Sequence, residues 1–513
     1  MKKYTKKILA FSLMAVFIIS VISVAGLSGN KTSNNPTTTI TGTPADNYPE
    51  DKQTTFCGTG AAKSNKYITE FKISTVCAQP LAITTDPSGT VWFAESNTGK
   101  IAKFDPFTRL FTEYENAKWP KGDRAMMWGI GYADDGNIWY TDDAHHIIWK
   151  FSTADKSFSS FKYPVAEGTK AFPQKLILHG DKILVNDFDG NKIIFFDSTQ
   201  SGQEIYNSSV NSPTTDTVTA ALAIDSSEKI WYTAWNFQTG EGNLLNYDPQ
   251  TSNGTKFNFP LGMRAPNGIS VDKQDKIWLS DTSSSFFFSF DPQSKRFTKY
   301  ITSPPQEVTY GNYSGLIKTP VTRPYWNSFD EMERLWFNEQ TGNSIAVFDP
   351  SKESLVEYLV PSQNPNWSDC GDLANCGISQ VLDFTINGEK VWFTEWVENN
   401  IGVLDSKVPL PFDVSVDKKN LILSKGDNAT LSLTITPKEN LNEAIRLITA
   451  TTAGLNDVTI KSENQEVILG SQPASVSFNV SVDKFALSGT YKILVGARNQ
   501  EVTISEYVTV TVK

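Results

Sequence analysis

The segment Val91-Trp92-Phe93-Ala94-Glu95-Ser96 recurs in related form through the middle of the chain. Each copy begins with two apolar residues, and the second is tryptophan in every copy except the third. The copies read VWFAES (91–96), IWYTDD (138–143), ILVNDF (183–188), IWYTAW (230–235), IWLSDT (277–282), LWFNEQ (335–340) and VWFTEW (391–396). Successive copies are spaced by 45 to 58 residues. Repeats of that length, built from short β-rich units, are typical of propellers and repeat arrays.

Each repeat contains further strips with the character of β-strands. An apolar run that ends in a turn precedes the tryptophan segment, as in LAITTDPSG (81–89). A third strip closes on an aromatic residue and Asp-Pro, as in Phe104-Asp105-Pro106, and a fourth follows, as in FTEY (111–114). Asp-Pro marks a turn, because Pro fixes φ and Asp accepts hydrogen bonds from the nearby backbone. Four short strips separated by turns predict one four-stranded blade.

The last repeat lacks a fourth strip after Val403-Leu404-Asp405. The missing strip occurs ahead of the first repeat, as YITEF (67–71). We therefore predict that this N-terminal strand completes the last blade, with Thr69 beside Val403. Closure of the ring in this way leaves no free strand edge between the first and last blades. The sequence thus predicts an all-β fold with a closed seven-bladed β-propeller over residues 67–405.

The two ends of the chain differ from the repeats. Residues 1–27 contain four early lysines followed by an apolar run, which predicts a secretory signal peptide or an N-terminal membrane anchor. Residues 28–66 form a predicted linker that is rich in Thr, Asn and Pro. Residues 410–513 contain no Trp and show alternating strips such as SVSFNVSV (475–482), which predict an immunoglobulin-like β-sandwich.

Composition favours an exported protein on the cell surface or outside the cell. Four cysteines behind an export signal predict two disulfides. The local pairing Cys57–Cys77 and Cys370–Cys376 is preferred, and a Cys77–Cys376 bridge is the alternative. Asn-x-Ser/Thr triplets, which fit a glycosylated surface protein, begin at Asn30, Asn207, Asn253, Asn312, Asn366, Asn428 and Asn479. A formal charge of −10 argues against nucleic acid or an anionic membrane surface as partner, so the membrane would be reached only through the N-terminal anchor.

Acidic residues at one repeat position predict a cluster at one mouth of the ring. The position three after the repeat Trp or Leu is occupied by Glu95, Asp142, Asp187, Asp281, Glu339 and Glu395. In one interpretation each carboxylate caps the turn that follows it or pairs with a base on a neighbouring blade. In the other, some of them, with Asn267 or Asn338, hold Ca²⁺ or Mg²⁺ on the axis, because hard cations prefer oxygen ligands.

Aromatic and basic residues outside the repeat positions are expected at the same mouth. These predicted ligand-binding residues are Trp128, Trp235, Arg264, Asn267, Arg323, Tyr325, Trp326 and Trp396. Aromatic rings with nearby arginines suit a planar or sugar-like ligand through stacking and hydrogen bonds. The alternative is that these aromatic side chains pack between blades. The expected partner is a glycan, a small molecule or a component of the cell envelope.

The pattern V-W-F-x-E, I-x-x-F-D-P and F-x-E-Y resembles the streptogramin lyase (virginiamycin B lyase) family of seven-bladed propellers. The resemblance covers every repeat and about two thirds of the chain. It implies a magnesium-assisted elimination that opens the ester of a cyclic depsipeptide, with a histidine as base and carboxylates at the metal. The segments that would carry this histidine contain none, and Asn267 occupies the nearest match. An amide cannot act as a base near neutral pH.

Three functions follow from these patterns. The sequence favours a secreted or cell-surface propeller that binds a ligand or has a structural role in the envelope, without the histidine of the family. The first alternative is a divergent metal-dependent lyase or a lactonase-type hydrolase. The second alternative is an assembly component of a surface layer. The histidines of the chain are His145, His146 and His179, and the pair after Asp142-Asp143 is expected in a solvated turn.

Overall fold

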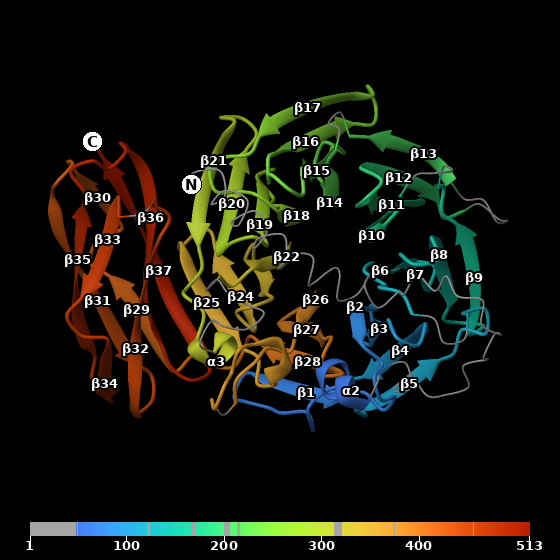
Figure 1. Cartoon of the computed structure of the whole chain (residues 1–513), viewed down its shortest axis with the longest axis horizontal. Helices are drawn as coiled ribbons and strands as arrows, with labels where there is room; N and C mark the ends of the chain where they lie inside the picture. The colour runs from blue at the N-terminus through green and yellow to red at the C-terminus, as the bar shows by residue number, and fades with distance from the viewer. Residues whose placement is uncertain are drawn as a thin grey trace, which may run out of the picture.

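The computed structural model describes residues 48, 50–120, 124–165, 170–199, 206–212, 216–311, 321–373, 375–454 and 456–513. The predicted signal or anchor, most of the linker, and the triplets at Asn30 and Asn312 lie outside the described residues. Strands dominate the described chain, and their sheets are arranged as a ring with further sheets on one side (Figure 1). Within the described ranges, no helix is long and apolar enough to cross a membrane.

The repeats form four-stranded antiparallel sheets, and the whole is a β-propeller. In the first sheet, β2 (Pro80–Thr85), β3 (Val91–Glu95), β4 (Lys100–Asp105) and β5 (Leu110–Tyr114) pair in chain order. The next two sheets are β6 (Ile130–Tyr132), β7 (Asn137–Asp142), β8 (Ile147–Ser152) and β9 (Ser157–Lys162), then β10 (Pro173–His179), β11 (Lys182–Asp187), β12 (Lys192–Asp197) and β13 (Tyr206–Asn211). They are followed by β14 (Val218–Ile224), β15 (Ile230–Trp235), β16 (Gly242–Asp248) and β17 (Asn253–Asn258), then by β18 (Pro266–Val271), β19 (Ile277–Asp281), β20 (Phe286–Asp291) and β21 (Arg296–Ile301). The strands β22 (Pro324–Phe329), β23 (Leu335–Glu339), β24 (Ser344–Asp349) and β25 (Ser354–Leu359) pair in the same order.

The two ends of the repeat region meet in a single sheet. Strands β26 (Val381–Asn387), β27 (Lys390–Glu395) and β28 (Asn400–Asp405) are joined there by β1 (Ile68–Lys72). β1 runs antiparallel to β28, and Thr69 lies opposite Val403. The predicted pairing of the N-terminal strand is therefore confirmed (Figure 1).

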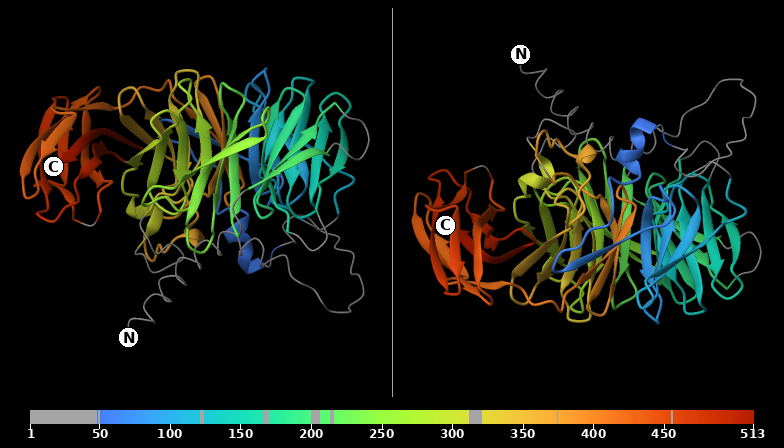
Figure 2. Two further views of the ribbon diagram at one scale, coloured as in Figure 1. Left: turned by 90° about the horizontal axis from the view of Figure 1, so that it is seen from above. Right: turned by 90° about the horizontal axis from the view of Figure 1, so that it is seen from below.

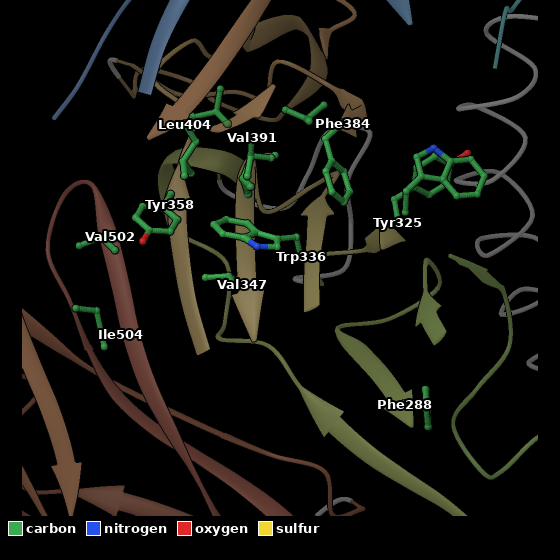
Figure 3. Close-up of a cluster of buried hydrophobic side chains, with 14 of the residues drawn as sticks. Phe288, Tyr325, Trp336, Val347, Tyr358, Phe384, Val391, Leu404, Val502 and Ile504 are labelled. Atoms are coloured by element: carbon green, nitrogen blue, oxygen red, sulfur yellow. The ribbon is translucent and has the colours of Figure 1, made fainter. Parts of the chain in front are cut away.

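The repeat tryptophans pack in the spaces between sheets and are at most 5% exposed. The ring of Trp92 lies 6.1 Å from that of Phe151 in the next sheet along the chain. Trp336 belongs to a cluster that includes Phe384 and Val391 of the following sheet (Figure 3). Large aromatic side chains bury more surface than other residues, so this single repeat position contributes strongly to holding neighbouring blades together.

Four of these tryptophans also form a hydrogen bond that the sequence analysis missed, which we call the Asp–Trp latch. The indole N–H donates to an aspartate six residues earlier, at 2.8–2.9 Å, in the pairs Asp86–Trp92, Asp225–Trp231, Asp272–Trp278 and Asp330–Trp336. The other oxygen of Asp86 accepts from the backbone N–H groups of Ser88 and Thr90. One carboxylate thus fixes the turn between two strands and orients the tryptophan of the second strand.

The C-terminal strands form two sheets, and one of them continues a propeller sheet. The first contains β29 (Phe412–Val416), β31 (Asn428–Pro437), β35 (Ala474–Val482) and β33 (Val458–Ser462). The second contains β34 (Glu466–Gly470), β32 (Leu441–Thr451), β36 (Gly489–Arg498) and β37 (Val502–Val512), with β30 (Asn420–Leu423) beside β37. Because β37 also pairs antiparallel with β25, both regions share one nine-stranded sheet (Figures 1 and 2).

The helix α2 (Glu50–Phe56) lies on one face of the ring, in a stretch that composition assigned to the linker (Figure 2). Its last residue, Phe56, packs edge-on against Trp367 and Trp396, at 5.8 and 6.2 Å between ring centroids. The disulfide Cys57–Cys77 ties the end of this helix to the propeller, and Cys370–Cys376 closes a short loop. Both disulfides have the preferred pairing. The packing of Phe56 and the disulfide Cys57–Cys77 thus hold in place residues whose composition resembles a linker.

Candidate functional site

A cavity of about 500 Å³ lies along the inner strands of the ring. Its walls come from β10, β14, β18, β22 and β26, each of which is an edge strand of its sheet. The lining residues belong mainly to the later parts of these strands, such as residues 175–179 of β10 and 326–329 of β22. The cavity is therefore located toward the ends of the inner strands, whereas the sequence analysis expected a site at their beginnings.

Two oppositely charged side chains from different inner strands form an ion pair in the wall of the cavity. Nζ of Lys175, in β10, lies 2.5 Å from Oδ1 of Asp383, in β26. The ammonium group also lies 4.7 Å from the ring centroid of Trp326, a cation–π arrangement. Burial lowers the pKa of Lys175 while the charge of Asp383 opposes this shift. Burial likewise raises the pKa of Asp383 against the effect of Lys175.

Three polar atoms of cavity-lining residues lack a hydrogen-bond partner within the described chain. They are Nε1 of Trp326, Oγ of Ser270 and Oδ1 of Asn327. Buried polar groups are normally paired, so these three covered atoms are exceptions within the residues that form the wall. Much of the remaining wall is apolar and includes Leu176, Ala221, Ala223, Ile269 and Phe384. A largely apolar hollow with a few placed polar groups is the usual form of a small-molecule site.

Three of the predicted aromatic residues gather where the inner strands begin. The rings of Tyr325 and Trp326 are 4.5 Å apart, and those of Trp128 and Tyr325 are 6.4 Å apart. Burial raises the pKa of Tyr325, so its hydroxyl stays protonated at neutral pH. Trp128 also lies 6.4 Å from Phe172. Of these rings, Trp326 is the one that lines the cavity.

The other predicted ligand-binding residues do not line this cavity: Trp235, Arg264, Asn267, Arg323 and Trp396. Trp235 is 1% exposed and packs edge-on against Phe188 of the preceding blade. Asn267 is also buried and donates to Oγ1 of Thr282 at 2.6 Å. Arg264 is exposed and donates to a backbone carbonyl. The position of Trp396, against Phe56, was described above.

The six predicted metal-binding carboxylates lie at the ends of the second strands, and each is held within or beside its own blade. Asp281 accepts from the backbone N–H groups of Ala265 and Ser283, at 2.9 and 3.1 Å. Asp187 accepts in the same way from Phe172 and Gly190. These bonds match the turn-capping interpretation. In the described part of the chain, no three His, Cys, Asp or Glu side chains are grouped so as to hold a metal ion.

Three of these carboxylates face a second acid on the outer strand of the same sheet. The pairs are Glu95 with Glu113, Glu339 with Glu357, and Glu395 with Glu70. Burial, followed by the charge of Glu113, raises the pKa of Glu95 to about 8. Burial and the neighbouring acid also raise the pKa of Glu339 and of Glu395. A signal for these pairs exists in the sequence, because the fourth strip of the same repeats contains glutamate.

The histidines lie away from the ion pair of the cavity. Nδ1 of His145 lies 2.8 Å from Asp142, in the turn after β7. His179 lines the far end of the cavity, where its ring pairs with Glu228 at 2.6 Å. The side chain of His179 is 43% exposed. The charged pair within the lining of the cavity is therefore Lys175 with Asp383.

Comparison with solved structures agrees with the propeller fold. A catalytically inactive form of virginiamycin B lyase from Staphylococcus aureus, solved with quinupristin, is 18% identical, with a TM-score of 0.51 over 66% of this chain and 98% of that one. A streptogramin B lyase structure is 19% identical, with the same TM-score over 66% of this chain and 97% of that one. Similarity at this level shows the fold alone. No protein-family model and no curated protein sequence matches this chain.

Proposed function

We propose that this protein is an extracellular or cell-surface β-propeller that binds a small molecule in its central cavity. The observation that carries the proposal is the cavity itself, where five inner strands surround an ion pair and three unpaired polar atoms. A purely structural core would fill such a space with apolar side chains and leave few polar atoms without partners. The volume of about 500 Å³ is within the usual range for ligand pockets.

The proposal includes a finer architecture. The sheets of the repeat region make one seven-bladed ring over residues 67–405, and residues 410–513 make an immunoglobulin-like sandwich beside it. Residues 1–27 serve as signal peptide or anchor, and residues 28–66 connect them to the ring. The two disulfides support a location outside the cytoplasm, because such bonds persist in oxidising compartments.

Ligand binding is favoured over the lyase reaction by the contents of the cavity. Asn267, which replaces the expected base, is buried and bonded to Thr282 instead of lining the cavity. The histidine that does line it, His179, is at the end remote from Lys175 and is paired with Glu228.

The test is a thermal-shift screen of a small-molecule panel against a variant with a blocked cavity. Ser328 is exposed and lines the cavity, so Ser328→Trp should obstruct it with little effect on folding. Ser294→Trp, at an exposed turn outside the cavity, is the matched control. A ligand of this site should raise the melting temperature of the wild type and of the control, and should lose its effect on Ser328→Trp. Equal shifts in all three proteins would place binding elsewhere.

A further inference from the structure

We infer that the cavity selects small molecules that carry a carboxylate, and that Lys175 is the residue that binds it. This inference rests on the proposed function and names the chemical class of its ligand. It is based on a difference between the two members of the ion pair. Lys175 has unused hydrogen-bond donors, whereas both oxygens of Asp383 already accept hydrogen bonds.

Lys175 has donors to spare. An ammonium group has three N–H donors and no acceptor. Among the described residues, Nζ of Lys175 donates to Oδ1 of Asp383, and the ring of Trp326 supplies the other close contact. The ring attracts the charge but does not replace a hydrogen-bond acceptor. Since the side chain lines the cavity and is 19% exposed, an incoming oxygen can reach the remaining donors.

Asp383 is already engaged on both oxygens. Oδ1 accepts from Lys175, and Oδ2 accepts from the backbone N–H of Ile83 at 3.2 Å. Its side chain is 6% exposed, compared with 19% for Lys175. A ligand cation would therefore have to compete with groups that are fixed by the fold. A ligand anion would meet the open donors on Lys175, whose side chain is the more exposed of the two.

The rest of the cavity suits the body of such a ligand. Apolar side chains such as Leu176 and Ile269 can cover rings or alkyl groups. The ligand class is therefore a carboxylic acid with an apolar body.

The experiment compares two probes, 6-hydroxy-2-naphthoate and its methyl ester, which share ring and hydroxyl but differ in charge. Titration calorimetry should give at least about tenfold tighter binding of the acid to the wild type, as expected for one charge-assisted hydrogen bond. Lys175→Met should remove this preference. Asp383→Asn should increase it, because the variant loses the anion that competes for the same ammonium group. Lys100→Met is the matched control, since Lys100 is also ion-paired and 17% exposed but is outside the cavity.

Each outcome has a separate meaning. Equal affinity of acid and ester for the wild type, or an unchanged preference in Lys175→Met, would overturn the inference while the proposed function stands. If neither probe binds at millimolar concentration, the inference fails, and the thermal-shift screen decides the proposed function independently. Should Lys175→Met fail to fold by circular dichroism, Asp383→Asn decides alone, and an unchanged preference in that variant overturns the inference.

Discussion

Two carboxylates flank the strand β3, Asp86 before it and Glu95 at its end. Their pKa values are shifted in opposite directions by their surroundings. Asp86 precedes the strand, and although burial opposes its ionisation, hydrogen bonds from Ser88 and Trp92 lower its pKa. Glu95 ends the strand in full burial, with one bond from Thr98 and no described partner for its other oxygen. Burial and the charge of Glu113 raise the pKa of Glu95 to about 8. The number of donors supplied by the fold decides which carboxylate remains charged.

The largest expected effect is on the pH dependence of stability, which Glu95→Gln should reduce. The folded pKa of Glu95 is raised from its usual 4.5 to about 8. Its contribution to stability is therefore complete below about pH 4.5 and is lost as the pH rises toward 8. Between pH 5 and pH 7 the loss amounts to about 2–3 kcal/mol. Urea unfolding at several pH values should show a flatter profile for Glu95→Gln.

The control for this prediction is Glu115→Gln, at an exposed position two residues after Glu113. It should retain the slope of the wild type. Parallel profiles for all three proteins would mean that Glu95 is ionised in the folded state, which would remove the contrast with Asp86.

The second prediction concerns the charged carboxylate before the second strand, and it uses Asp330→Ala. Asp330 occupies in its repeat the position that Asp86 occupies in the first. Asp330 accepts from the backbone N–H groups of Met332 and Arg334, from Nε of Arg334 and from the indole of Trp336. Its loss leaves several donors without an acceptor and should destabilise the fold by about 2 kcal/mol. Asp134→Ala, at an exposed turn residue, is the control and should have little effect. A loss below about 0.5 kcal/mol for Asp330→Ala would show that the latch is not a stabilising device.

The third prediction installs a latch where the protein has none. The turn at Ala133 has the same two backbone hydrogen bonds as the turn at Asp86. The N–H of Ala133 donates to the carbonyl of Asn137, and the N–H of Gly136 donates to the carbonyl of Ala133. The indole N–H of Trp139, six residues after Ala133, is buried without a partner in the described structure. Ala133→Asp should therefore stabilise the protein by about 1 kcal/mol in chemical denaturation. The gain should vanish in a Trp139→Phe background, and its persistence there would refute the latch as the cause.

The smallest expected effect is the difference in stability loss between Trp139→Phe and Trp278→Phe. Trp139→Phe and Trp278→Phe both lose part of a buried indole, but Trp278 also donates to Asp272. Trp278→Phe should be costlier by about 1 kcal/mol, since it leaves a buried acceptor unpaired. Calorimetric melting of the two variants measures this difference. Equal losses would mean that packing alone sets the value of the repeat tryptophan.

Sequence was sufficient for the propeller because the fold repeats its own signals. The strip YITEF (67–71) could be matched to the gap after Asp405 by comparison with complete repeats, and the structure pairs Thr69 with Val403. The Asp–Trp latches were also visible, as aspartate six residues before tryptophan, but no rule of strand alternation draws attention to that spacing. The pairing of β25 with β37 left no such trace, because both strands read as ordinary alternating strands.

The cavity could be predicted only in part. Trp326 was expected near the axis and lines the cavity. The contact between Lys175 and Asp383 was not foreseen, since 208 residues separate them and their approach depends on how the blades are placed around the ring. Trp235 was expected either at the same mouth as Trp326 or packed between blades, and it packs against Phe188. Nothing in the alternation of the strand distinguishes a tryptophan that packs between sheets from one that lines the axis.

The nine-stranded sheet has a consequence for how force and orientation pass through the molecule. β37 is hydrogen-bonded to β25 on one side and to β36 on the other, and Tyr507 on it donates to the backbone of Ile301 at 2.7 Å. A load applied to the C-terminal sheets would therefore enter the ring through the hydrogen bonds between β37 and β25, instead of through a flexible tether. A surface that anchors these sheets would fix the direction in which the channel axis points.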